Sequence, residues 1–314
     1  MSALNLVPAN INLSFIPKRK MFMAFSALLV AASVFMFLSK GLNYGIDFKG
    51  GIMLEVRTEK AANIAEMRTT LGDLGLGEVS LQEFGQPTDV LIRIQRQDGG
   101  EKAQQEAVNT IKAALGSSVE YRRTEFVGPK VSDELFWDGL TAVGLAILAI
   151  LIYIWFRFEW QFGLGAVVAL SHDVITTIGI FALMGFEFNL STVAAVLTIA
   201  GYSINDTVVV FDRVRENLRK YKKMPFPELL NNSINQTLSR TVITSVTTML
   251  ALLALYILGG EVIRDFSFAM IWGVLVGTYS SVFVASSTLL RLGVKRDWSK
   301  PSNTDGNQFA NIDA

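Results

Sequence analysis

Long apolar runs recur along the chain, and polar segments that hold most of the charged residues separate them. Each run has the length, about 17–25 residues, that an α-helix needs to cross the hydrocarbon core of a bilayer. The chain of 314 residues is 51% hydrophobic and 18% charged, which is typical of polytopic membrane proteins rather than of soluble enzymes. The sequence therefore predicts six membrane-spanning helices, at residues 21–39, 139–156, 162–186, 189–211, 240–260 and 266–290.

The charges between these runs are unevenly distributed. A basic triplet at 18–20 precedes the first run and basic clusters follow the fourth and sixth, whereas the links after the third and fifth hold few charges. By the positive-inside rule, both termini are expected in the cytoplasm. Within the fourth-to-fifth link, 228–239 fits either a short interfacial helix or an extension of the fifth span. The predicted cytoplasmic parts are an N-terminus at 1–20, a loop at 212–239 and a tail at 291–314.

Residues 40–138 have the composition of a soluble domain, and the topology places them outside the cytoplasm, as a periplasmic domain. Alternating and helical spacings predict the order β-α-β-β-α-β, which is that of a ferredoxin-like split βαβ domain. The segment contains no histidine and no cluster of metal ligands. We interpret it as a binding or coupling module. The predicted elements are Ile46–Thr58, Ala61–Leu74, Val79–Phe84, Val90–Ile94, Glu101–Leu115 and Val119–Val127.

A glycine-rich stretch joins the first run to this domain. Its glycines predict unusual backbone conformations or the close approach of another segment. The stretch lacks the spacing of a phosphate-binding loop, and the whole chain lacks cysteine, so no cofactor or metal site is predicted. We interpret it as a rigid stalk whose motif residues are Gly45, Asp47, Phe48, Gly50 and Gly51.

Asp206 is the single acidic or basic side chain between residues 189 and 211. A charge at membrane depth costs several kcal/mol unless it is paired, hydrated or protonated. Arg240 opens the fifth run, and both residues are expected about 10 Å inside the membrane, so antiparallel helices would bring them together. We predict an Asp206–Arg240 pair whose carboxyl group takes up and releases protons. The structural alternatives are a static ion pair and an Arg240 that snorkels to the surface.

Other polar residues of the fourth and fifth runs are candidates for accessory roles. Asn205 lies beside Asp206, and Thr244 belongs to a hydroxyl-rich stripe that can bond across helices or line a hydrated path. Asp212 is expected to pair with Arg213 at the membrane surface.

The third run contains the single histidine of the chain, His172, followed by Asp173. The two residues either join a proton relay or form a polar contact between helices. Consecutive helical residues point about 100° apart, so the Ser-His-Asp order does not imply a catalytic triad. In the sixth run, the small residues of 273–277, continued by Ser280 and Ser281, predict close helix packing.

Together, these motifs resemble those of the SecF family of protein-export membrane proteins, from about residue 15 to 295. The 201–213 block alone is highly specific for that family. The matching motifs are G-I-D-F-K-G-G at 45–51, V-G-P-K-V-S at 127–132, R-F-E-W at 157–160, H-D at 172–173, G-Y-S-I-N-D-T-V-V-V-F-D-R at 201–213, S-R-T-V-I-T-S at 239–245 and G-T-Y-S-S at 277–281.

The resemblance implies a polytopic α-helical protein of the bacterial inner membrane, half of a bundle of the resistance-nodulation-division (RND) type, with one ferredoxin-like domain. It also implies a heterodimer with SecD, association with the SecYEG channel and YajC, and use of the proton-motive force to assist late translocation of an unfolded preprotein. In the family, the acid and arginine that correspond to Asp206 and Arg240 are implicated in proton flow, and SecD contributes a further acid. No nucleic acid is implied.

Two other functions remain open. The chain could be half of an RND-type exporter of small molecules or lipids, although such exporters usually carry about twelve spans and two large external domains. It could instead be a scaffold that stabilises the channel without transducing energy. An enzyme is least favoured, because no nucleotide, metal or nucleophile motif is present.

Overall fold

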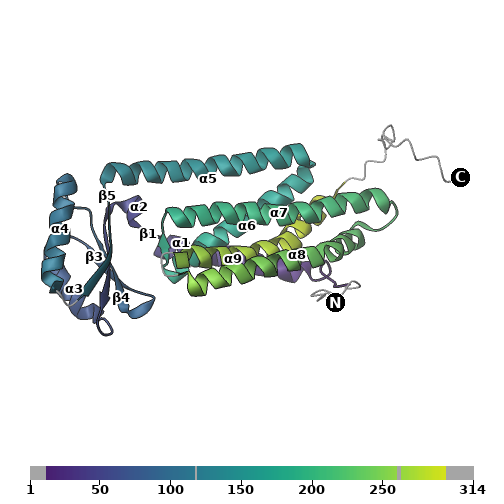
Figure 1. Cartoon of the computed structure of the whole chain (residues 1–314). Coiled ribbons are helices and arrows are strands. Elements are labelled where there is room, and N and C mark those ends of the chain that lie inside the picture. Colours follow the sequence, from purple (N-terminus) through teal and green to yellow (C-terminus); the bar gives the residue numbers. More distant parts are fainter. Residues whose placement is uncertain (1–11, 117–118, 260–262, 295–314) are drawn as a thin grey trace, which may run out of the picture.

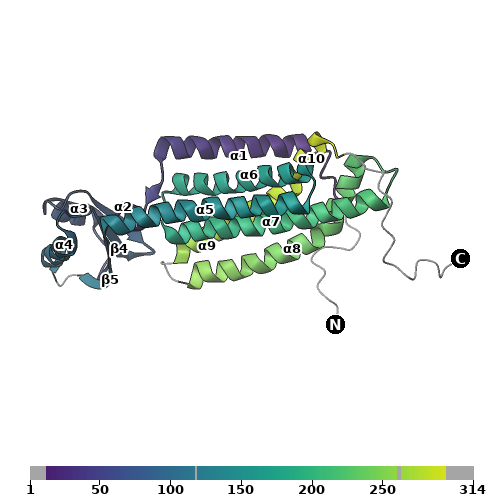
Figure 2. The ribbon, with the colours of Figure 1, turned by 90° about the horizontal axis from the view of Figure 1, so that it is seen from above.

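The computed structural model describes residues 12–116, 119–259 and 263–294. The long helices lie side by side in an elongated bundle, and a small sheet domain lies at one end of it (Figure 1). A view turned by 90° shows the same arrangement (Figure 2). Most of the predicted cytoplasmic N-terminus and tail falls outside the described residues.

Within these described residues, six helices are long and apolar enough to cross a membrane, which confirms the predicted number. The sixth consists of α9, a π-helical turn at Ser281–Ala285 and α10, which together we call the sixth span. The helices are α1 (Arg19–Lys40), α5 (Pro129–Arg157), α6 (Trp160–Met184), α7 (Leu190–Lys220), α8 (Phe226–Leu258), α9 (Arg264–Ser280) and α10 (Ser286–Leu292).

Three helices run beyond their apolar runs. α5 begins before residue 139, α7 continues past 211, and α8 begins well before 240. The segment 228–239 is therefore an extension of the fifth span, and most of the predicted loop 212–239 is helical. Hydropathy locates the part of a helix that suits a bilayer, whereas polar ends outside it remain helical without an apolar signal. The extended ends of α7 and α8 lie at the end of the bundle away from the sheet (Figure 1).

The helices differ in how deeply the bundle buries them. In α6, α7 and the sixth span, 50%, 50% and 61% of the most apolar window is buried, against 11%, 6% and 11% in α1, α5 and α8. α6, α7 and the sixth span therefore form the centre of the bundle. α1, α5 and α8 present apolar faces that lipid or another protein has to cover.

Small residues set the closest helix contacts. A Cβ atom at Gly273 of α9 would collide with Ile199 of α7, and one at Gly179 of α6 would collide with Ser33 of α1. The predicted close packing around Gly273 is confirmed, and its partner is α7 of the same chain. Such contacts bring helix backbones near enough for short polar side chains to reach across.

The sheet domain has the predicted β-α-β-β-α-β order. Its strands lie in the order β3-β4-β2-β5, and every neighbouring pair is antiparallel. Alternate residues of β2 and β4, such as Ile52 and Ile92, pack against Leu71 and Ile111 of the two helices. The elements are β2 (Gly51–Thr58), α3 (Ile64–Gly72), β3 (Val79–Phe84), β4 (Gln86–Ile94), α4 (Gly100–Leu115) and β5 (Val119–Val127).

The first predicted strand was wrong at its start. Residues Ile46–Lys49 form a short helix, α2, and the strand begins at Gly51. The change of direction falls on Gly50 and Gly51, whose φ angles of 68° and 126° lie in the left-handed region that favours glycine. A Cβ at Gly51 would also meet the carbonyl oxygen of Ile94 at 2.5 Å, so the second glycine allows β4 to approach.

The stalk connects the sheet domain to the start of α7. β1 (Asn43–Tyr44) pairs in parallel with β6 (Glu187–Phe188), which lies between α6 and α7. Asp47 of α2 accepts a hydrogen bond from the backbone N–H of Leu190 at 3.0 Å, and so adds to the capping box that Asn189 and Thr192 form at the first turn of α7. A Cβ at Gly45 would collide with Glu187.

Further contacts tie the stalk to both parts of the molecule. The ring of Phe48 lies about 6 Å from those of Phe136 on α5 and Phe188. Arg93 of β4 forms an ion pair with Glu187. The predicted stalk is therefore a clamp between the sheet domain, α5 and the beginning of α7.

The face of the sheet opposite its helices carries an ion pair between β2 and β4. Arg57 donates two hydrogen bonds to Asp89, at 2.6 and 2.7 Å, from the position directly across the ladder. The hydrogen bonds from Arg57 lower the pKa of the buried Asp89 carboxyl, and the charges of Arg57 and Arg122 add to this effect against the cost of desolvation.

Asp89→Asn should weaken the sheet at neutral pH and remove part of its acid sensitivity. A depressed carboxyl pKa contributes stability above the unfolded pKa of about 3.9, and this contribution is lost as the pH falls through the lower folded value. We expect amide exchange in β2 and β4 of the full chain at pH 7 to show an opening free energy lower by roughly 1–2 kcal/mol. Glu59→Gln, at an exposed turn, is the matched control. It should change neither the opening free energy at pH 7 nor the dependence of stability on acid pH.

Asp47→Ala should loosen the first turn of α7, because the N–H of Leu190 loses its acceptor. The expected cost is about 1 kcal/mol, the usual value of a helix cap. Hydrogen exchange at residues 190–193 measures it. Asp47→Asn keeps an acceptor oxygen and should behave more like the wild type, and equal exchange in all three proteins would contradict the capping role.

Candidate functional site

Asp206 lies in the middle of α7 and is 7% exposed. Its Oδ1 accepts a hydrogen bond from the hydroxyl of Thr241 on α8 at 2.8 Å. Its Oδ2 accepts one from the hydroxyl of Ser281 in the sixth span at 2.7 Å. The carboxyl group therefore joins three helices through neutral donors.

The structure does not show a direct ion-pair contact between Asp206 and Arg240, although the charge of Arg240 lies near enough to act on the carboxyl group. Among the described residues, Arg240 forms no ion pair with Asp206, and its side chain is exposed on α8. Consecutive helical residues point about 100° apart, so a helix that turns Thr241 toward Asp206 turns Arg240 away from it. Arg240 is exposed as a residue, and it interacts with Asp206 through its charge rather than through a hydrogen bond.

The neighbouring candidates Asn205 and Thr244 do not contact Asp206. The hydroxyl of Thr244 bonds to the backbone carbonyl of Arg240 at 3.0 Å, within its own helix. Asn205 is exposed and points away from the centre of the bundle. These two side chains therefore do not join the hydrogen bonds of Asp206.

Asp212 has a different partner from the one predicted. It forms an ion pair with Arg157, at the end of α5, with two contacts of 2.8 Å. Arg213 pairs with Glu216 on its own helix. The interpretation of Asp212 as a surface pair holds, but the ion pair links α7 to α5 because Arg157 approaches from the neighbouring helix.

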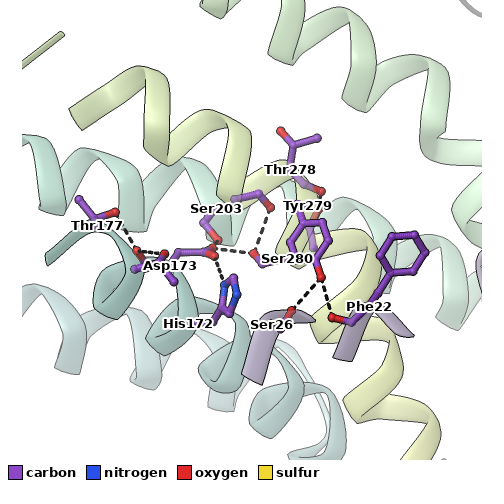
Figure 3. A network of polar contacts seen from close by, with 12 residues as sticks. Phe22, Ser26, His172, Asp173, Thr177, Ser203, Thr278, Tyr279 and Ser280 are labelled. Carbon is purple, nitrogen blue, oxygen red and sulfur yellow. Dashed lines mark hydrogen bonds and ion pairs between the residues drawn. The ribbon is translucent and has the colours of Figure 1, made fainter. Parts of the chain in front are cut away.

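A second buried carboxyl group lies on α6 (Figure 3). Asp173 is fully buried, and its Oδ2 accepts hydrogen bonds from Ser203 of α7 at 2.5 Å and from Ser280 of α9 at 2.6 Å. Its Oδ1 lies 2.9 Å from Nδ1 of His172. His172 and Asp173 are therefore partners of each other, and two serines from other helices complete the cluster.

Four consecutive side chains of the sixth span contact four different helices. Thr278 bonds to Ser245 of α8, Tyr279 donates to the carbonyl of Phe22 on α1, Ser280 reaches Asp173 on α6, and Ser281 reaches Asp206 on α7. These distances lie between 2.6 and 2.7 Å. Figure 3 shows the first three of these side chains pointing in different directions from one helix.

Sequence reasoning missed this hydroxyl cluster. It interpreted Ser280 and Ser281 as small residues for helix packing, and that role is compatible with their position. Ser281 is also the first residue of a π-helical turn, an irregularity that the spacing of apolar residues does not reveal. A run of four hydroxyl-bearing residues inside an apolar span was the one signal in the sequence.

Comparisons with known proteins agree with this architecture. Residues 35–62 match the family model described as the SecD/SecF GG motif, and residues 107–295 match that of the protein export membrane protein SecD/SecF, C-terminal. The first match contains the stalk, and the second contains both buried carboxylates.

Curated relatives match over almost their whole length. The protein translocase subunit SecF of Cereibacter sphaeroides is 47% identical, with 99% of each chain covered. That of Rhodobacter capsulatus is 47% identical, covering 96% of this chain and 95% of the relative. That of Rickettsia felis is 46% identical, with coverages of 95% and 97%.

Two solved structures share the fold. SecDF, a translocon-associated membrane protein from Thermus thermophilus, has a TM-score of 0.83 and 38% identity over 90% of this chain. SecDF in a super-membrane-facing form has a TM-score of 0.64 and 35% identity over 91% of this chain. This chain covers 39% of each of those longer chains. The chain thus belongs to the SecF family of protein translocase subunits and is a multi-pass protein of the inner membrane.

Proposed function

We propose that this protein, paired with SecD, uses the proton-motive force to assist the late steps of preprotein translocation. In this proposal Asp206 is the group that takes up and releases the proton, and Arg240 is the cation that modulates it. Both termini lie in the cytoplasm and the sheet domain lies in the periplasm. The SecYEG channel, YajC and the unfolded preprotein are the further partners.

The observation that carries the proposal is the environment of Asp206. The buried carboxyl group has two hydroxyl partners and no ion pair within the described part of the chain. A hydroxyl donates to an ionised carboxylate and can rotate to accept from a protonated one, so the same partners serve both states. The carboxyl group therefore has hydrogen-bond partners in both protonation states, and neither state is excluded at this position.

The energy available from protons is sufficient for a conformational switch. One elementary charge that crosses the membrane gains about 2.3 kcal/mol per 100 mV. A two-state equilibrium moves from 1:99 to 99:1 with about 5.5 kcal/mol. Two protons in a field of about 120 mV supply that amount.

The position of Arg240 supports a partner on the open side of α8. A guanidinium at membrane depth needs a counter-charge, and the exposed apolar faces of α1, α5 and α8 need cover. A second six-helix subunit that brings an acid against α8 provides both. The greater length of the solved SecDF chains, of which this chain covers 39%, agrees with a second half.

The stalk supplies the mechanical connection. α7 carries Asp206, and Asp47 of the stalk caps its first turn. A change in the position of α7 therefore acts on the stalk and, through the ion pair of Arg93 with Glu187, on the sheet domain. We propose that protonation of Asp206 moves the sheet domain in this way.

Asp206→Asn should retain folding and pairing with SecD, because the amide is close in shape to the carboxyl group. Stimulation of preprotein transport by the proton gradient in inverted membrane vesicles should fall to the level seen with an uncoupler. Asp212→Asn, which changes an exposed carboxyl on the same helix, is the control and should keep the stimulation. Full stimulation by Asp206→Asn would contradict the proposal and favour a scaffold.

Arg240→Ala should separate function from stability. The side chain is exposed and makes no ion pair with another described residue, so the unfolding free energy of the isolated chain should change by less than about 0.5 kcal/mol. Gradient-driven stimulation should nevertheless be lost in the complex with SecD. An Arg240→Ala complex with normal stimulation would remove the arginine from the mechanism.

A further inference from the structure

The His172–Asp173 pair has the properties of a second proton-binding site. Both side chains are buried, at 4% and 0% exposure, in a helix at the centre of the bundle. Asp173 receives hydroxyl groups from Ser203 and Ser280 in addition to its contact with Nδ1 of His172. Nε2 of His172 is buried and has no hydrogen-bond partner in residues 12–116, 119–259 and 263–294.

The pair can hold one proton more or one fewer. With Nδ1–H donated to an ionised Asp173, the pair carries one negative charge. A proton added at the free Nε2 makes the pair neutral, either as imidazolium and carboxylate or, after the Nδ1 hydrogen moves to Oδ1, as imidazole and carboxylic acid. The charged form is the costly one in a buried site, so the pair is a place where a proton binds.

Few other titratable groups face the pair. Between Lys20 and Lys40, α1 has no charged residue, and α5 has none between Asp138 and Arg157. The ring of Tyr279 in the sixth span lies 6.1 Å from that of His172. From α7 the titratable groups are Tyr202 and Asp206, on either side of Ser203, and Arg291 ends α10. Asp206 thus lies three residues along α7 from Ser203, which itself donates to Asp173.

Two adjacent serines connect the two carboxyl groups. Ser280 has one hydroxyl hydrogen and two acceptors, Oδ2 of Asp173 at 2.6 Å and the carbonyl of Gly277 at 3.1 Å. Ser281 likewise has Oδ2 of Asp206 at 2.7 Å and the carbonyl of Thr278 at 3.0 Å. Each hydroxyl can therefore turn from the carboxylate to its own helix when the acid becomes protonated.

The orientations of the two serine hydroxyl groups are linked through the backbone. Ser280 and Ser281 are consecutive, and the π-helical turn starts at Ser281, where the α-helical bonding pattern is interrupted. A shift of one serine toward its acid moves the other serine with it. Two like charges in a poorly polarisable interior also disfavour each other, so both effects link the proton occupancy of one acid to that of the other.

We propose that His172 and Asp173 form a second proton-binding site that is coupled to Asp206 through Ser280 and Ser281, so that the two acids do not load protons independently. The proposal rests on the proposed role of Asp206 as a proton carrier. It assigns to His172 the entry of the proton, and to the two serines the positioning of both carboxyl groups.

Infrared difference spectroscopy during a pH titration tests the coupling, on the complex of this chain with SecD in lipid nanodiscs. Asp173→Asn and Asp206→Asn assign the carboxylic-acid bands of the two residues. We expect two titrating bands, and each variant should shift the midpoint of the other acid by about one pH unit. The proposal would be overturned if Asp173 did not titrate in the wild-type spectrum. It would also be overturned if the midpoint of each acid stayed the same when the other acid was replaced by asparagine.

The two serines form a matched pair of positioning variants. Ser280→Ala should shift mainly the Asp173 band and Ser281→Ala mainly the Asp206 band, and the double variant should reduce the mutual shift. Ser267→Ala changes a buried hydroxyl of the same span that has no hydrogen-bond partner among the described residues, and should leave both bands unchanged. Equal effects of all three single variants would argue for a general packing defect and against the coupling.

His172→Asn keeps an N–H donor at the position of Nδ1 but cannot titrate, so it tests the pair if Asp173→Asn does not fold. We expect it to shift the Asp206 midpoint and to reduce gradient-driven transport at least threefold. If Asp206→Asn abolishes stimulation while His172→Asn changes neither quantity, the coupling is wrong and the role of Asp206 stands. If Asp206 itself does not titrate, the proposed function fails as well.

Discussion

Buried carboxyl groups in a bilayer-length bundle need hydrogen-bond donors, and this requirement organises the centre of the protein. Asp173 and Asp206 lie on neighbouring helices, and neither has a lysine or arginine partner among the described residues. Their donors are hydroxyls and an imidazole, which are neutral and short. Helices have to approach closely for such short groups to meet, and glycines such as Gly273 and Gly179 allow that approach.

The sixth span is the common partner in this arrangement. Its four residues Thr278–Ser281 contact α8, α1, α6 and α7 in turn, and the last of them begins the π-helical turn. A helix with regular α-geometry points four consecutive side chains in four directions about 100° apart, and a span at the centre of a bundle has neighbours in all of them. A change at either acid therefore reaches the whole bundle through one short segment.

α7 connects this centre to the sheet domain. It begins at Leu190, whose N–H donates to Asp47, and carries Asp206 sixteen residues later, about 24 Å along a continuous helix. The stalk around Asp47 is built from β1, α2 and the glycines that turn the chain, and it also contacts α5. The glycines of the motif are needed because the chain turns sharply there and also lies against Glu187 and β4.

Local sequence determined much of this protein. Apolar runs predicted six spans, alternation predicted the strands Val79–Phe84 and Val119–Val127 at their observed ends, and an isolated acid in an apolar helix identified Asp206. Tertiary structure decided which polar groups meet. Thr241 rather than Arg240 faces Asp206, Arg157 rather than Arg213 pairs with Asp212, and Ser280 and Ser281 bind acids on two different helices. Hydrophobic periodicity is a property of each segment by itself, whereas the partner of a side chain depends on how every helix is rotated against its neighbours, and one residue along a helix changes that direction by about 100°.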